Sequence, residues 1–112
     1  MIKDEPGKVI AIYIGESDHV GGKPLSAAIV ERAREEGMVG ATVARGIMGF
    51  GAHSKIHATR FELLSQDLPV VVTIIDTPDK VDAFLPVLHG MVKEGMVVTW
   101  DAHIELYRDG SD

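Results

Sequence analysis

The chain has 112 residues, 46% of them hydrophobic and 25% charged, which is typical of one globular domain and not of a disordered chain. The balance of 17 acidic against 11 basic residues lacks the basic footprint of a nucleic-acid-binding protein. The absence of cysteine excludes disulfides, thiol catalysis and cysteine-bound zinc. No run approaches the roughly 20 apolar residues of a membrane span. Residues 1–7 are too polar for a signal peptide, so we expect a cytoplasmic protein without a transmembrane segment.

The first half of the chain predicts a strand, a helix and a second strand. Residues 8–15 are apolar at nearly every position, which indicates a strand buried on both faces. A glycine pair follows, and Pro24 suits the first turn of a helix. Apolar residues then recur at helical spacing until Gly37, the expected C-terminal cap. Residues 40–47, rich in small side chains, form the second predicted strand.

The second half predicts two further strands around a helix. Residues 60–64 could form a short extra strand or part of a hairpin. Residues 68–76 are again apolar on both faces, and residues 96–107 alternate apolar and polar positions, so both segments are predicted strands. Residues 1–7 and 108–112 are expected to be loose tails of a single domain that spans residues 1–112.

The second helix has a clear beginning and an irregular middle. Thr77 is the expected N-cap and Pro78 the first helical residue. Pro86 should bend or shorten the helix, because proline lacks an N–H group and clashes with the preceding turn. Gly95 is expected to end this segment before the last strand.

The order β-α-β-β-α-β predicts an α+β fold of the ferredoxin-like type, with two helices on one face of a four-stranded antiparallel sheet. The first and third strands carry apolar residues on both sides. In a monomer the face without helices would expose a large apolar patch to water. We therefore expect an oligomer.

Five segments resemble the PII-like proteins classed as domain of unknown function 190. They are GATVARGIMGFG at residues 40–51, GKPL at 22–25, SQDLPVVV at 65–72, IIDTPDKV at 74–81 and MVKEGMV at 91–97. The resemblance implies a regulatory homotrimer that needs no cofactor and binds an adenine nucleotide in clefts between subunits. It also implies that residues 52–58 form a loop that relays the bound state to a protein partner.

The sequence departs from the PII signalling proteins after the second helix. Those proteins carry a glycine-aspartate-glycine-lysine run there, whereas this chain has HGMVKEG at residues 89–95. Without that run, a monophosphate or a different ligand suits the site as well as ATP does, and AMP or ADP is the expected effector.

The glycine-rich turn after the second strand supplies the main candidate site. Gly46, Gly49 and Gly51 could bring backbone N–H groups close to a phosphate, or could serve only a tight turn. Phe50 could stack on a base or plug the subunit interface. Arg45 could hold a phosphate or pair with an acidic residue across subunits.

Four further residues are weaker candidates for the same site. His89 and Lys93 lie where the resemblance places a second phosphate loop, although both also suit an ordinary helix end. Asp67 and Asp76 lie at the two ends of the third strand, where each could bond a ribose hydroxyl or serve a turn or a helix start.

A metal-responsive or structural trimer without nucleotide is the alternative function. His53 and His57 are four residues apart and are weak metal-ligand candidates in a predicted loop. Asp101 and His103 share a face of the last strand, but polar alternation explains both. No nucleophile elbow or phosphate-loop motif is present, so we do not expect an enzyme.

Overall fold

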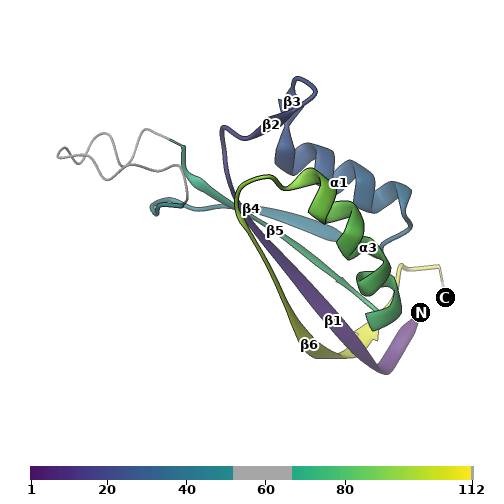
Figure 1. The fold of residues 1–112 in the computed structure, drawn as a ribbon. Helices are drawn as coiled ribbons and strands as arrows, with labels where there is room; N and C mark the ends of the chain where they lie inside the picture. Colours follow the sequence, from purple (N-terminus) through teal and green to yellow (C-terminus); the bar gives the residue numbers. More distant parts are fainter. Residues whose placement is uncertain (52–66, 112) are drawn as a thin grey trace.

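The computed structural model describes residues 1–51 and 67–111. It contains one four-stranded antiparallel sheet in the order β4-β5-β1-β6, with helices α1 and α3 together on one face (Figure 1). This is the predicted α+β arrangement. The elements are β1 Ile2–Gly15, β2 His19–Val20, β3 Lys23–Pro24, α1 Leu25–Glu35, β4 Ala41–Arg45, β5 Pro69–Asp76, α3 Pro78–Met91 and β6 Met96–Tyr107.

The core lies between the sheet and the two helices. Alternate residues of β1 and β5 point toward the helices, because successive strand side chains face opposite sides of a sheet. Apolar side chains of α1 and α3 pack against them at helical spacing. The buried core consists of Ile10, Ile12, Ile14, Val70, Val72 and Ile74 from the sheet, and Leu25, Ile29, Ala33, Val81, Phe84 and Leu88 from the helices.

Among the described residues, no helix covers the opposite face of the sheet, and this face carries exposed apolar side chains. On this face Val9 of β1 has a cross-strand partner in each neighbouring strand, Trp100 in β6 and Ile75 in β5. Trp100 is 48% exposed, Tyr13 46% and Ile75 42%. The predicted apolar surface without a helix cover is therefore confirmed.

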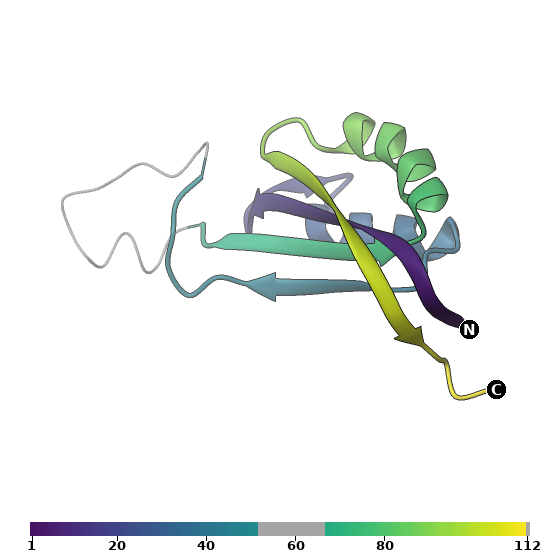
Figure 2. The same ribbon diagram turned by 90° about the horizontal axis from the view of Figure 1, so that it is seen from below.

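Strand β1 begins six residues earlier than predicted. Ile2 pairs with Tyr107 and Gly7 with Ala102, so residues 2–7 form a two-stranded extension with β6 and are not a loose tail (Figure 2). The expectation was wrong because this extension lies beyond the helices, where both of its sides are mostly exposed. Such a strand needs no apolar alternation.

Three smaller differences concern the ends and the interior of elements. Strand β4 covers only Ala41–Arg45, and a short hairpin of β2 and β3 turns at Gly21 and Gly22, both with positive φ. The second helix is not shortened at Pro86, which lies on its exposed side, and the helix ends at Met91, before Gly95. Thr77 is the N-cap residue, as predicted. The C-cap residue of α1 is Glu36, and Gly37, the expected cap, directly follows it with positive φ.

Residues 60–64, a possible extra strand, lie outside the described residues. In the part of the chain that is described, no helix has the length and apolar character needed to cross a membrane.

Candidate functional site

Four strand ends meet at one end of the sheet because neighbouring strands are antiparallel. Gly15 at the end of β1 pairs with Pro69 at the start of β5, and Arg45 at the end of β4 pairs with Val70. Met96 at the start of β6 pairs with Tyr13. The glycine-rich turn after β4 and the loop between α3 and β6 are therefore brought to the same end of the fold.

A small cavity of about 90 Å³ lies where these segments meet. Its wall combines the end of β1, the turn after β4, the start of β5 and the loop before β6. The lining residues are Tyr13, Ile14, Gly15, Asp18, Phe50, Gly51, Asp67, Pro69, Glu94 and Gly95. The segments around Phe50 and around Glu94, which the sequence predicted separately as parts of a ligand site, thus line one cavity.

Gly46 and Gly49 serve the turn by packing against Pro69. The backbone N–H of Gly46 donates to the carbonyl oxygen of Pro69 at 2.7 Å, so it is engaged within the chain. A Cβ on Gly46 would lie 2.7 Å from Cγ of Pro69, and one on Gly49 would lie 2.9 Å from the same atom. Of the two interpretations of these glycines, the contacts support the structural one.

Phe50 and Gly51 differ from those two glycines because they line the cavity. Phe50 is 69% exposed, and a Cβ on Gly51 would meet no atom within 4 Å. The chain therefore places a large aromatic face and an open stretch of backbone beside the cavity, where a planar group could stack.

Arg45 is bound within its own chain. Its Nη2 atom lies 2.9 Å from Oε1 of Glu16, and its Nε donates to Oε2 of Glu16 at 3.1 Å. This two-point pair joins the end of β4 to the segment after β1. Neither interpretation of Arg45, a phosphate grip or an ion pair across subunits, included this partner, and both stay predictions.

The cavity wall is acidic, and two of its carboxylates are fixed by backbone groups. Asp18 Oδ2 accepts the N–H of Gly15 at 2.9 Å, and Asp67 Oδ1 accepts the N–H of Ser17 at 2.7 Å. Glu94 adds a third carboxylate to the wall. The carboxylate oxygens of Asp18 and Asp67 that are not used in these bonds can accept hydrogen bonds from hydroxyl groups, whereas the negative charge of both groups repels phosphate.

A second, more open cavity of about 420 Å³ adjoins the first and shares Asp18 and Glu94 with it. Its remaining lining residues are His19, Val20, Gly21, Leu25, Met91 and Lys93. Lys93 thus lines the same cavity as Asp18 and Glu94 of the acidic wall. His89, one turn earlier on α3, is exposed and lines neither cavity.

Comparison with known proteins identifies the relatives of this chain. The DUF190 family model, described as an uncharacterized ACR, matches residues 7–104. The chain belongs to the DUF190 family. A UPF0166 protein of Aquifex aeolicus is 36% identical over 97 residues, covering 87% of this chain and 91% of that protein. A UPF0166 protein of Methanocaldococcus jannaschii is 32% identical over 98 residues, covering 87% and 90%.

Two solved structures of a PII-like protein share the fold of this DUF190 chain. CPII of Thiomonas intermedia K12, bound to ADP and bicarbonate, gives a TM-score of 0.55 at 19% identity, with 95% of both chains covered. The same protein bound to ADP, AMP and bicarbonate gives 0.54 at 20% identity, with 95% and 94% covered. At this identity the likeness shows the fold, which agrees with the PII-like resemblance.

Asp76 is placed away from the site of this DUF190 protein. It lies at the other end of β5 from Pro69 and is 1% exposed. Its Oδ2 accepts the N–H of Val39 at 3.0 Å and its Oδ1 accepts the N–H of Thr77 at 2.7 Å. Of the two interpretations of Asp76, these bonds support the helix start and not a ribose contact.

The predicted loop at residues 52–58, with His53 and His57, lies outside the described residues. The sequence did not point to Tyr13 and Asp18 as site residues, although both line the small cavity. The signal for Asp18 was present, because a polar segment directly follows a fully apolar strand and must therefore lie at a sheet edge.

Proposed function

We propose that this DUF190 protein is a PII-like regulatory module that binds an adenine nucleotide at clefts between the subunits of a homotrimer. The proposal rests on one observation above all. The turn after β4 and the loop before β6 line a common cavity at the end of β1, through Phe50, Gly51, Glu94 and Gly95. The nucleotide-bound CPII structures, which share the fold, support an adenine nucleotide as the ligand class.

The size of the cavity supports a site shared between chains. Small-molecule sites usually measure about 300–1,000 Å³, whereas the cavity beside Phe50 measures about 90 Å³. The adjoining cavity of about 420 Å³ is the more open of the two, so in our proposal one chain supplies only part of an enclosed nucleotide site. A neighbouring chain, packed on the apolar face around Trp100, would complete it.

The charges around the two cavities favour a nucleotide with few phosphates. In our proposal Phe50 stacks on the adenine, Asp18 and Asp67 accept hydrogen bonds from the ribose hydroxyls, and Lys93 faces the phosphate. Each further phosphate would bring more negative charge toward Asp18, Asp67 and Glu94, at an energetic cost. AMP or ADP is therefore the proposed effector in preference to ATP.

The output of the proposed module is binding to a protein partner. We assign no catalytic group to it. The relay would run from the cavity through Gly51 into residues 52–58, which directly follow the cavity wall in the chain. A ligand changes such an equilibrium only if it binds one of the two states more tightly. The proposed setting is the cytoplasm.

Nucleotide titrations of the full chain by calorimetry and thermal unfolding test this function. A ligand at a hundred times its Kd adds about 2.7 kcal/mol of stability, and should raise the Tm by several degrees. We expect that rise with AMP or ADP. Gly51→Val and Lys93→Gln should each weaken binding at least about tenfold, a change of about 1.4 kcal/mol.

Matched variants separate the site from general effects of substitution. Gly40→Val is the control for Gly51→Val, because a Cβ at either position meets no atom within 4 Å. Lys3→Gln is the control for Lys93→Gln, since Lys3 is also exposed but lies on the far part of β1. Unchanged Tm with every adenine nucleotide would refute the proposed ligand class, and binding that survives both site variants would refute the site.

A further inference from the structure

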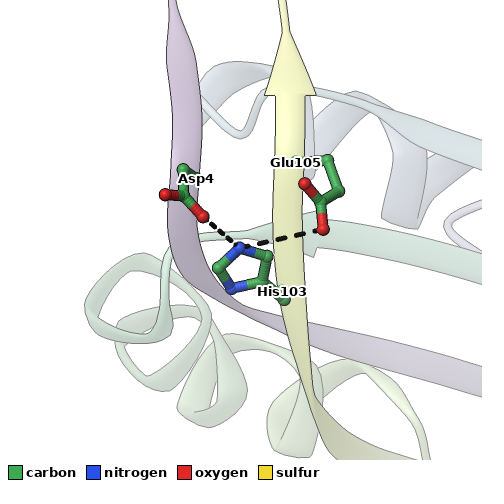
Figure 3. A group of neighbouring side chains, drawn as sticks. All are labelled: Asp4, His103 and Glu105. Carbon is green, nitrogen blue, oxygen red and sulfur yellow. Dashed lines mark hydrogen bonds and ion pairs between the residues drawn. The ribbon is translucent and has the colours of Figure 1, made fainter.

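Three metal-ligating side chains meet at the opposite end of the sheet from the cavity. Asp4 of β1 and His103 and Glu105 of β6 lie together on the two-stranded extension (Figure 3). One ligand atom from each lies within 4.8 Å of the other two. All three side chains are exposed, so an ion in water can reach them directly.

The register of the two strands places the carboxylates against each other. Lys3 pairs with Leu106 and Glu5 with Ile104. Asp4, which has a positive φ of 52°, and Glu105 lie between these two pairs, and a carboxylate oxygen of each lies within 4.8 Å of the other. His103 lies two residues before Glu105 on β6. Like charges directly opposite each other destabilise an antiparallel pair. A cation between Asp4 and Glu105 would remove that repulsion.

In the described part of the chain, no lysine or arginine forms an ion pair with Asp4 or Glu105. Within those residues, the ion-pair contacts of Asp4 and Glu105 are with His103 alone. The Nε2 atom of His103 lies 2.6 Å from Oδ1 of Asp4 and 3.9 Å from Oε1 of Glu105. The imidazole nitrogen therefore lies between two carboxylates that have no other ionic partner among the described side chains.

This donor set fits a divalent transition-metal ion. Zinc binds imidazole nitrogen and carboxylate oxygen at about 2.0–2.2 Å, so tetrahedral ligand atoms stand about 3.4 Å apart. The two contacts of His103, at 2.6 and 3.9 Å, fall on both sides of that value. Small rotations of exposed side chains would equalise them. The pairs on either side, Lys3 with Leu106 and Glu5 with Ile104, hold the two strands together around the site.

We propose that Asp4, His103 and Glu105 bind one divalent transition-metal ion per chain, such as Zn²⁺, with water in the remaining positions. One nitrogen and two oxygens suit zinc and its transition-metal neighbours better than magnesium, which prefers oxygen ligands alone. The bound ion would join the first strand of the chain to the last. The site is separate from the nucleotide cavity, and the proposal does not rest on the proposed function.

Zinc titration of the full, metal-free chain tests the proposal by calorimetry and by NMR of the histidine rings. We expect one zinc ion per chain and a shift of the His103 ring signals on binding. His103→Ala and Glu105→Gln should each weaken this binding at least about tenfold. Affinity should also fall at lower pH, because the ligands must be deprotonated.

His19→Ala is the matched control. His19 is another exposed histidine, and its Nδ1 lies 2.5 Å from the carbonyl oxygen of Ser17, away from the cluster. This variant should bind zinc as the unmodified chain does. The ring signals of His103 distinguish this site from binding by other histidines of the chain. Zinc affinity that is unchanged in His103→Ala, or His103 signals that do not respond to zinc, would overturn the proposal.

Discussion

Gly95 lies directly against the backbone of Tyr13. A Cβ on Gly95 would stand 2.5 Å from the carbonyl oxygen of Tyr13 and 3.1 Å from Cγ2 of Ile14. Gly95 also has a φ of 139°, which side chains other than hydrogen rarely allow. Glycine is therefore required here both by conformation and by space. This contact brings the loop before β6 onto the end of β1, where both residues line the small cavity.

Gly95→Ala should destabilise the fold and disturb the cavity wall. We expect a loss of about 1–3 kcal/mol in the free energy of unfolding, measured by urea denaturation, from backbone strain. Gly90→Ala is the control, because Gly90 lies within α3 and its Cβ would meet no atom within 4 Å. That substitution should be neutral or stabilise by up to about 1 kcal/mol, since alanine favours a helix. Equal stability of the two variants would contradict the role of Gly95.

Asp76→Asn should also reduce stability. Asp76 is the buried charged residue of the described chain, and its two oxygens accept from Val39 N–H and Thr77 N–H. Asparagine replaces one acceptor with a donor and leaves one of these N–H groups without its partner. A loss of about 1–3 kcal/mol is expected in urea denaturation. Asp82→Asn, at an exposed position of α3, should reduce the free energy of unfolding far less. A similar loss in both variants would contradict the bonding role of Asp76.

The architecture could be predicted from sequence because its signals are local and strong. The alternation across Met96–Tyr107 defined β6 at both ends, and Thr77-Pro78 defined the start of α3. The extension of β1 through residues 2–7 could not be predicted, because exposed strand residues carry no apolar pattern. The β2–β3 hairpin did carry a signal, the Gly21-Gly22 pair, which is typical of a two-residue turn.

The candidate site was only partly predictable. Phe50 and Gly51, predicted from sequence as ligand contacts, line the small cavity, and Lys93 lines the adjoining one; their contact with a ligand stays a prediction. The partner of Arg45 was not predictable, because Glu16 lies 29 residues away in sequence and reaches Arg45 only after the strands pair. The same applies to Asp4 and His103, which are 99 residues apart and meet through the β1–β6 register.

The pKa of Lys8 should depend on Asp82. Lys8 Nζ donates to Oδ1 of Asp82 at 2.7 Å, and this hydrogen bond, followed by the charges of Asp82 and Asp101, raises the pKa of Lys8 above its ordinary 10.5. A raised pKa in the folded state means that the pair stabilises the fold below pH 10.5 and that this contribution is lost as pH rises through the raised value.

Asp82→Asn should therefore lower the pKa of Lys8, as followed by NMR titration of its side-chain ammonium signals. Asp101→Asn should lower it by a smaller amount, because Asp101 acts by charge alone and is the last of the causes. The stability difference between Asp82→Asn and the unmodified chain should shrink at the alkaline end. An unchanged Lys8 pKa in Asp82→Asn would contradict this pairing.

Trp100→Lys should dissociate the proposed trimer. Trp100 pairs with Val9 of β1 and lies on the face of the sheet that points away from α1 and α3. A charge placed in the centre of a buried apolar interface loses hydration without gaining a partner. Light scattering after size-exclusion chromatography should show trimers of the unmodified chain and monomers of this variant at micromolar concentration.

Thr99→Lys is the matched control for the interface. Thr99 is the neighbouring residue of β6 and is also exposed, but its side chain shares the face of its partner Ile10, which points toward the helices. The proposed subunit interface lies on the other face of the sheet, which the side chain of Thr99 does not share. Thr99→Lys should therefore remain trimeric. A trimer that persists in Trp100→Lys would exclude this face as the interface. Dissociation by both substitutions would point instead to a general effect of added charge.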